Sequence, residues 1–330
     1  MLNRVRQWNF SFKIDGLQNL GYLNGILVFF LKKVKMTKNT ILKLSIFLML
    51  LATCKKEDEG LPQEEPYTPI TISSDWFDVN YINPKTYSLE ETQSSQYNVS
   101  YMILGDSKAI MFDTGSGENQ PVNGFKIKPV IDQLTQLPVT LLLSHFHFDH
   151  NQNISEFSTL GFPDLPFLRQ SVTADDIYTF TAEDLFIGSY PAQVQVNEWY
   201  PVNTDIDLGN RIIQLVNIPG HTKESVAIID KTNKMAFLGD YLYNGALFLF
   251  DSNDLIIYKE SIDYLISILD DNYKLFGAHG TPEITYEKLE KLKAFLVCIE
   301  NNICQSTATN LWGYDVLVYE YEGMEIVVFQ

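Results

Sequence analysis

The feature that most constrains this chain is a group of three histidines and one aspartate packed into a short stretch. His145, His147, Asp149 and His150 follow an apolar run at residues 139–143 and form the pattern His-x-His-x-Asp-His. In an extended segment, side chains two positions apart project to the same side, so His145 and His147 can bind one ion. Once the chain turns, Asp149 and His150 can reach a second ion. The pattern therefore predicts a strand that ends at a metal site.

The other candidate ligands also follow apolar runs that are typical of strands. The chain has five histidines, and the remaining two are His221 in Pro-Gly-His-Thr and His279 in Gly-Ala-His-Gly. Small neighbours let a metal approach the backbone closely. Asp240 follows Phe-Leu-Gly and can bridge two cations. A lone buried histidine is more often structural than a ligand, but here every histidine lies in such a motif. Imidazole and carboxylate suit zinc and iron.

Between these positions the chain alternates strand-like and helical patterns. Hairpins are predicted at residues 97–112, 225–238 and 316–329, single strands at 139–143 and 212–218, and helices at 126–137, 258–269 and 286–299. The last hairpin is expected to turn at Glu322-Gly323. Hairpins separated by helices predict an α+β protein with helices outside packed sheets.

In this order, the motifs resemble those of the metallo-β-lactamase superfamily over residues 75–285. The resemblance rests on Asp-Thr-Gly at residues 113–115, the histidine cluster, Pro-Gly-His-Thr at 219–222, Gly-Asp at 239–240 and Gly-Ala-His-Gly at 277–280. It implies a four-layer αβ/βα sandwich with the site at one edge of two packed sheets.

The resemblance also implies two metal ions, zinc by preference, with iron or manganese as alternatives. The implied ligands are His145, His147 and His221 for one metal and Asp149, His150 and His279 for the other, with Asp240 and a hydroxide bridging them. Two close cations make hydroxide available near neutral pH. Asp149 and Asp240 would act as catalytic groups that orient this hydroxide and move its proton to the leaving group. Asp113 would either hydrogen-bond a ligand histidine or a neighbouring loop, or simply cap its turn.

The identity of residue 240 narrows the substrate class that the resemblance implies. Members that hydrolyse β-lactams usually have Cys or Ser there, whereas Asp is typical of glyoxalase II-like thioesterases, lactonases, nucleases and sulfatases. Tyr243 matches a lactonase tyrosine that contacts the substrate carbonyl, although core packing explains it equally well. Residues 285–330 look too short and too acidic for the glutathione-binding domain of glyoxalase II. We therefore expect a small-molecule ester, lactone or thioester.

Three alternatives remain open at this point. An iron-dependent persulfide dioxygenase-like oxidoreductase of the same fold uses a subset of the same ligands. A metallo-β-lactamase proper would differ in substrate. A surface binding protein with a vestigial site is the third, although the complete ligand set argues against decay. Aromatic residues are frequent at 162–200, where some can line a substrate pocket and most are expected to pack in the core.

Charge argues against nucleic acid as the substrate. The chain has 24 basic and 41 acidic side chains, and eight of the basic ones but only Asp15 of the acidic ones precede residue 55. The rest of the chain is therefore strongly acidic and repels phosphate backbones.

The N-terminal residues are typical of a bacterial lipoprotein. Met36 begins a short basic segment, and an apolar run at residues 44–52 leads to Cys54. This run is too short to span a bilayer comfortably and suits a signal peptide. Thr53 departs from the usual Gly, Ala or Ser of a lipobox, and an uncleaved anchor helix is the alternative. We expect a lipid anchor at Cys54 in the outer membrane of the cell envelope, with display at the cell surface as an option.

The expected domain boundaries follow from these features. Residues 1–35 are interpreted as a non-native upstream extension, 36–54 as the lipoprotein signal peptide, 55–70 as a flexible acidic tether and 71–330 as the catalytic domain. Two further cysteines, Cys298 and Cys304, lie in or near a predicted helix, where six positions apart they point to different sides. A disulfide would need the helix to end between them, so buried or unpaired thiols are expected.

Overall fold

The computed structural model describes residues 68–330 except residue 84, 118–125 and 187–192. These residues belong to one compact unit, Glu64–Gln330. The predicted upstream extension, signal peptide and nearly all of the tether, with Cys54, lie outside the described residues and stay predictions. Within the part that is described, none of the helices has the length and apolar character needed to cross a bilayer.

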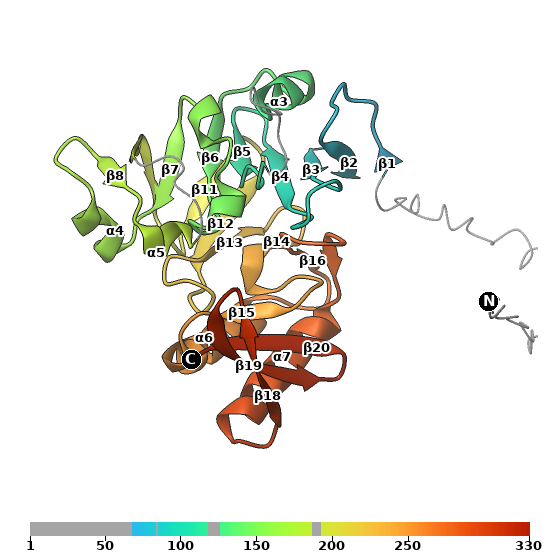
Figure 1. The fold of residues 1–330 in the computed structure, drawn as a ribbon. Helices are drawn as coiled ribbons and strands as arrows, with labels where there is room; N and C mark the ends of the chain where they lie inside the picture. Colours follow the sequence, from blue (N-terminus) through green and yellow to red (C-terminus); the bar gives the residue numbers. More distant parts are fainter. Residues whose placement is uncertain (1–67, 84, 118–125, 187–192) are drawn as a thin grey trace, which may run out of the picture. The chain divides into compact units, whose positions relative to one another are not determined.

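Two large sheets form the centre of this unit (Figure 1). The first has the order β1-β2-β3-β4-β5-β6-β7-β10. Its strands are β1 (Thr68–Pro69), β2 (Asp78–Asn83), β3 (Thr86–Glu90), β4 (Val99–Leu104), β5 (Ala109–Phe112), β6 (Val139–Leu142), β7 (Leu160–Pro163) and β10 (Glu198–Tyr200). The predicted hairpin at 97–112 is confirmed, since β4 and β5 pair antiparallel.

The second sheet has the order β11-β12-β13-β14-β16-β17. Its strands are β11 (Asp205–Asp207), β12 (Ile212–Asn217), β13 (Val226–Asp230), β14 (Met235–Phe237), β16 (Lys274–Phe276) and β17 (Glu283–Ile284). The hairpin predicted at 225–238 is β13 and β14. Strand β16 pairs parallel with β14, and the intervening chain contains α6 (Leu255–Ile268).

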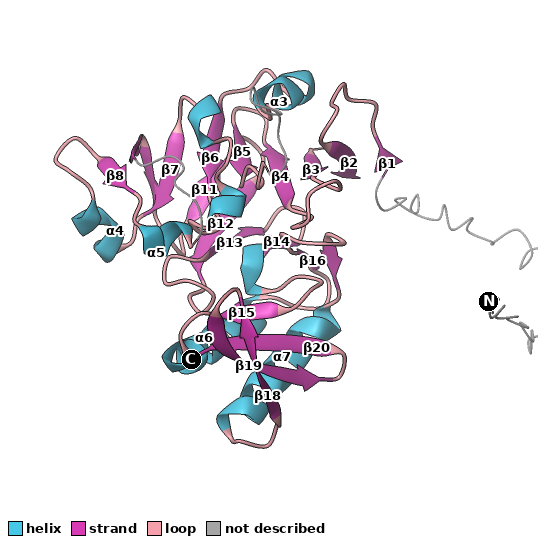
Figure 2. Ribbon diagram, in the orientation of Figure 1, coloured by secondary structure: helices cyan, strands magenta, loops and turns pink. Residues whose placement is uncertain are grey.

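Alternating side chains separate the molecule into layers. In β4, Tyr101 and Ile103 pack between the two sheets, while Met102 contributes to the core on the other face together with Ile131 of α3 (Lys128–Leu134). Ile229 of β13 packs in a third core with α6 and α7 (Tyr286–Glu300). The period-two alternation buries both faces of both sheets. The result is the four-layer αβ/βα sandwich that the family resemblance implied, with α3 on one outer side and α6 and α7 on the other (Figure 2).

A four-stranded C-terminal sheet adds to this frame. Its order is β15-β20-β19-β18, with β15 (Leu247–Leu249), β18 (Ser306–Leu311), β19 (Tyr314–Tyr321) and β20 (Met324–Phe329). The hairpin turning at Glu322-Gly323 is confirmed. Strand β18 was not predicted, because its polar sequence is exposed at nearly every position and shows no apolar alternation.

Smaller elements complete the described chain. A two-stranded sheet joins β8 (Ile177–Thr179) and β9 (Gln193–Gln195). Helix α4 (Pro166–Ser171) begins at a proline, and α5 (Ala182–Leu185) begins after Thr181, which forms a reciprocal capping box with Asp184. Both helices lie in the segment 162–200 that the sequence marked as rich in aromatic residues.

The expectation of unpaired thiols at the C-terminal cysteines is wrong. Cys298 and Cys304 form a disulfide, and their Cα atoms lie 5.3 Å apart. Helix α7 ends at Glu300, and Asn302 takes a left-handed conformation with φ of 55°. The helix thus ends between the two cysteines, and the chain that follows turns back so that Cys304 can reach Cys298.

Candidate metal centre

The seven candidate ligands converge at the ends of strands from both large sheets. His145 and His147 follow β6, and Asp149 and His150 lie on the short helix η1 (Phe148–His150). His221 follows β12, Asp240 lies on η3 (Gly239–Tyr241) after β14, and His279 follows β16. The ends of these four strands therefore bring the seven candidate ligands to one edge of the sandwich.

Local packing explains why the first two histidines face the same way. Phe146, between them, is buried in the core, with its ring centroid 4.8 Å from that of Phe162. Its backbone is also fixed, because its amide donates to Glu224 Oε1 at 3.2 Å and its carbonyl accepts from Asn151 Nδ2 at 2.9 Å. With Phe146 held in the core, His145 and His147 project to the opposite side, as the alternation predicted.

A glycine lets Asp240 approach this cluster. Gly239 has a φ of 55°, and a Cβ atom placed on it would lie 2.7 Å from the Cβ of Ser144. A side chain at position 239 would therefore collide with the residue that precedes the histidines. The Gly-Asp motif thus reflects a close backbone approach that only glycine permits.

The candidate ligand atoms fall into two groups. One group consists of His145, His147 and His221, and the other of Asp149, His150, Asp240 and His279; within each group the ligand atoms all lie within 4.8 Å of one another. Asp240 lies between the groups. Its Oδ2 is 3.0 Å from His279 Nε2 and 3.6 Å from His221 Nε2, and its Oδ1 is 3.3 Å from His150 Nε2. Asp240 is therefore a candidate ligand of the second group that also approaches the first, and its bridging role stays a prediction.

The donor set fits divalent cations. His145 Nε2, His150 Nε2 and Asp240 Oδ1 are buried and none forms a hydrogen bond of good geometry, although the last two lie 3.3 Å apart. Such atoms are costly to bury unless something binds them. His147 Nδ1 and His221 Nε2 also face each other at 3.1 Å. Imidazole nitrogens and carboxylate oxygens that converge in this way suit two cations, one for each group.

Groups behind the histidines fix the orientation of their rings. His145 Nδ1 lies 3.0 Å from Ser144 Oγ, His221 Nδ1 lies 3.1 Å from the carbonyl of Phe248, and His279 Nδ1 lies 2.8 Å from the carbonyl of Gln96. These contacts leave Nε2 of each ring facing the centre. Sequence reasoning missed Gln96 and Phe248, since a backbone carbonyl carries no residue-type signal.

Asp113 contacts both a candidate ligand and a neighbouring loop. Its Oδ2 lies 3.0 Å from His150 Nδ1, and its Oδ1 accepts from the amide of Ser144 at 2.6 Å. Its φ of 66° is left-handed, a conformation that Asp and Asn adopt more readily than most residues. The prediction of a hydrogen bond to a ligand histidine is thus confirmed over that of a plain turn cap.

Replacing Asp113 with Asn is expected to weaken metal binding by about 10- to 100-fold, the usual cost of losing a partner behind a ligand. Asparagine keeps the shape and tolerates the left-handed backbone, so the change isolates the charge that orients His150. Competition with a chromogenic zinc chelator measures the affinity. Asp271→Asn, at an exposed position, is the control. Equal affinity in Asp113→Asn and the control would contradict a role for Asp113 in the site.

Electrostatics differ between the two groups. Burial, reinforced by neighbouring histidines, lowers the pKa of His145 and of His147 well below the usual value, which favours the neutral form that binds metals. Burial also acts to lower the pKa of His150, but the carboxylates of Asp240, Asp149 and Asp113 outweigh it and raise this pKa well above the usual value. The second group contains the carboxylates of Asp149 and Asp240, whereas the first consists of histidines, so the second group is the more negatively charged.

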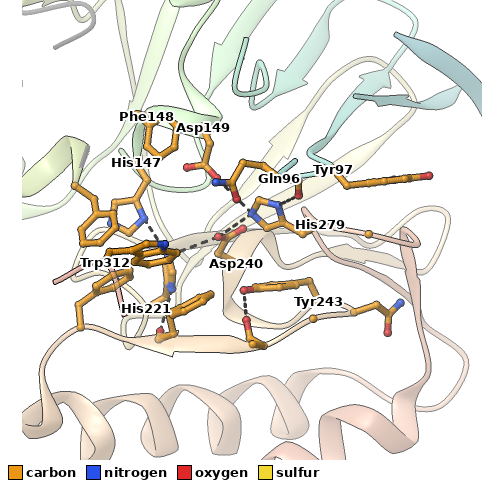
Figure 3. A pocket seen from close by; sticks show the side chains of 17 residues that line it. Gln96, Tyr97, His147, Phe148, Asp149, His221, Asp240, Tyr243, His279 and Trp312 are labelled. Carbon is orange, nitrogen blue, oxygen red and sulfur yellow. Dashed lines mark hydrogen bonds and ion pairs between the residues drawn. The ribbon is translucent and has the colours of Figure 1, made fainter. Parts of the chain in front are cut away.

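The centre forms one wall of a pocket of about 390 Å³ (Figure 3). Besides five of the candidate ligands, the described lining includes Gln96, Tyr97, Phe148, Phe186, Tyr243, Phe248, Phe250 and Trp312. In Figure 3, Trp312 lies on the side of His147 and His221, while Tyr97 and Tyr243 lie on the side of His279. The hydroxyl of Tyr243 donates to the carbonyl of Ala246. A contact between this hydroxyl and a substrate stays a prediction.

The aromatic segment at 162–200 contributes one residue to this pocket among those described. Phe162, Tyr178 and Phe180 are buried in the core, and Trp199 packs against it. Phe186 instead lines the pocket, with its ring centroid 5.6 Å from that of His147. The sequence did not single out Phe186, because nothing local distinguishes it from the aromatic residues that pack.

Comparisons with known proteins agree with this geometry. No family model matches the chain. It is 24% identical over 183 residues to the human acyl-coenzyme A thioesterase MBLAC2, a match that covers 50% of this chain and 63% of the relative. A probable metallo-hydrolase of Bacillus subtilis (strain 168), YqgX, is 25% identical over 151 residues, which is 44% of this chain and 67% of that one. The match thus spans less than two thirds of the thioesterase.

Solved structures show the fold. The metallo-β-lactamase IND-7 superposes with a TM-score of 0.51 at 13% identity, covering 68% of this chain and all of that one. TMB-1 superposes with a TM-score of 0.50 at 14% identity, covering 68% of this chain and 99% of TMB-1. The chain therefore has the metallo-β-lactamase fold. The relatives that the chain is similar to are named a thioesterase and a probable metallo-hydrolase, and the chain carries two groups of candidate metal ligands.

Proposed function

We propose that this chain is a zinc-dependent hydrolase of a small ester, lactone or thioester. One observation carries the proposal: two groups of buried ligand atoms, joined by the approach of Asp240 to His221, contribute five side chains to the wall of a pocket large enough for a small molecule. The name of the thioesterase relative supports the thioester branch of this class.

Two bound cations would supply a water of lowered pKa and a Lewis acid for the carbonyl oxygen of the substrate. The protein's own part is positioning. The contacts of the histidine rings with Ser144, Asp113, Phe248 and Gln96 hold the ligands before any substrate arrives. A site fixed in advance stabilises developing charge without reorganising during the reaction.

We assign the proton transfer to Asp149, and its surroundings support this assignment. Its carboxylate lines the pocket, and Asn98 holds it by donating to its carbonyl at 2.9 Å and to Oδ2 at 3.4 Å. Oδ2 lies 3.6 Å from both His150 Nε2 and His279 Nε2. A carboxylate held at the pocket surface can accept a proton from the attacking water and pass it to the leaving group.

Hydrolysis of one substrate class is expected from the full chain loaded with zinc, and a chelator should abolish it. The panel comprises lactones, thioesters, aryl esters, β-lactams, phosphodiesters and sulfate esters, each assayed with and without the chelator. Turnover of a lactone, thioester or aryl ester would support the proposal. Turnover of β-lactams alone would contradict the substrate class.

No turnover, in protein shown by elemental analysis to bind two metals, would contradict the hydrolase assignment. The same protein loaded with iron would then be assayed for oxygen uptake with a persulfide. Uptake would identify the dioxygenase-like alternative, which uses a subset of the same ligands.

A further inference from the structure

The turn between β18 and β19 places a tryptophan where the backbone disfavours one. Leu311 pairs with Tyr314, so Trp312 and Gly313 form a two-residue hairpin loop. Both have left-handed backbones, with φ of 54° and 91°. This geometry matches a type I′ turn, which strongly prefers Asn-Gly, and a bulky residue there is strained. Strain of this kind concentrates at functional sites.

Trp312 also keeps an apolar ring exposed beside the pocket. Its side chain is 54% exposed, yet it belongs to the described lining of the pocket. The ring stacks on Phe248, with centroids 5.5 Å apart and an interplanar angle of 29°. The Phe186 ring lies 5.7 Å away. Phe186 is left-handed as well, with a φ of 59°. Two strained aromatic residues from separate elements thus meet at this pocket.

This aromatic surface is continuous with the first group of candidate ligands. The centroid of Phe250 lies 4.6 Å from that of Phe186, 5.0 Å from that of His147 and 5.2 Å from that of His221. An aromatic ring of the substrate that stacks on Trp312 and Phe186 would therefore hold the scissile bond beside it close to the candidate metal ligands. A flat apolar group bound to such a surface buries apolar area and also stacks on the aromatic rings, and both effects stabilise binding.

The charges around the pocket select against anions. No Lys or Arg belongs to its described lining. The Lys288 ammonium, nearby, already donates to the carbonyl of Tyr243 at 2.7 Å and to Asn244 Oδ1 at 3.0 Å. Among the described residues that line the adjoining pocket, of about 670 Å³, five are acidic and Lys223 is the one Lys or Arg. Beyond the reach of the two proposed metal ions, a carboxylate or phosphate on the substrate would lie there without a cationic partner from the described lining.

We propose that Trp312, Phe186 and Phe248 form a subsite for an uncharged aromatic ring next to the scissile bond. This inference rests on the proposed function and narrows its substrate class to neutral aryl-bearing esters and thioesters. The C-terminal sheet, which supplies Trp312 and Phe248, is then the element that sets specificity. Trp312 is a binding residue in this scheme and takes no part in the chemical step.

The decisive variant is Trp312→Asn, because it removes the ring and restores the residue that the turn prefers. The melting temperature should rise, while the KM for the neutral phenylacetyl thioester of N-acetylcysteamine should increase about five- to tenfold, in line with the loss of an aromatic contact. The KM for the acetyl thioester, which carries no ring, should increase less than the KM for the phenylacetyl thioester in the same variant. Ile256→Ala, at a 57% exposed site on α6, is the matched control.

A binding measurement separates this proposal from the proposed function. Phenylacetamide, a neutral compound, is titrated calorimetrically into zinc-loaded wild type, Trp312→Asn and Ile256→Ala. Weaker binding to Trp312→Asn alone supports the subsite, even if no ester is hydrolysed. Equal binding to all three proteins, or a lower melting temperature of Trp312→Asn with an unchanged KM, overturns it. A lower KM for phenylacetyl-coenzyme A than for the neutral thioester would overturn the proposed selection against anions.

Discussion

Asp240→Asn is expected to lower chelator-sensitive hydrolysis by at least about a hundredfold, the usual cost of removing one preorganised electrostatic group from an active site. Asp240 is the carboxylate closest to both groups, with contacts of 3.0 to 3.6 Å to His279, His221 and His150. Burial acts to raise its pKa, but His279 and His150 outweigh burial and hold this pKa well below the usual range. The carboxylate is therefore ionised, and its negative charge is available to two cations. Asparagine keeps the volume but removes that charge.

The measurement combines steady-state hydrolysis with elemental analysis of bound metal. Asp240→Asn should retain less than two metals per chain, whereas the exposed Asp271→Asn should match wild type in both respects. Circular dichroism of each variant checks that the fold persists. Full activity in Asp240→Asn would remove the bridging role and with it the two-metal scheme.

Arg211→Met is expected to destabilise the protein by about 3–5 kcal/mol, the cost of breaking a buried ion pair by removing one partner. Arg211 is almost fully buried. Its Nε and Nη2 both donate to Asp230 Oδ2, at 3.0 Å and 2.6 Å respectively. It also donates to Thr86 Oγ1 and to the carbonyls of Lys85 and Leu104 at 2.7 to 3.0 Å. Arg211 thus joins β13 of one sheet to β3 and β4 of the other.

Thermal and denaturant unfolding of the zinc-free protein measure this loss without a contribution from metal binding. The double variant Arg211→Met/Asp230→Asn should recover part of it, because asparagine removes the unpaired charge and still accepts from the amides of Thr232 and Asn233, each 3.1 Å from Oδ1 of the native side chain. A double variant no more stable than Arg211→Met would show that the charge of Asp230 is not the source of the loss.

Local patterns were sufficient to predict much of this molecule. His145 and His147 share a side because strand geometry alternates side chains, and that holds for any extended segment. The hairpin at Glu322-Gly323 follows from turn chemistry within two residues, whose φ values are 47° and 81°. The order of such local elements predicted helices outside packed sheets. The four-layer sandwich was implied by the family resemblance, and the layers of alternating side chains confirm it.

Other features depend on residues that meet only after folding. The carbonyl of Gln96 supports His279 from 183 positions away, and the guanidinium of Arg211 reaches the carbonyl of Leu104 across 107 positions. No local period encodes such contacts. The disulfide required the end of α7 to fall between Cys298 and Cys304, and sequence patterns place helix ends only to within a few residues.

The candidate site likewise has one part that local sequence predicts and another part that depends on tertiary contacts. Its candidate metal ligands were predictable from the sequence, because each of them stands in a short motif with small or apolar neighbours. The tertiary structure alone placed the pocket's aromatic wall, because Phe186, Phe248 and Trp312 look like ordinary core residues in the sequence. They become a wall only when β20 pairs beside β15 and the β18–β19 turn reaches the metal centre, contacts that are made across more than sixty residues of chain.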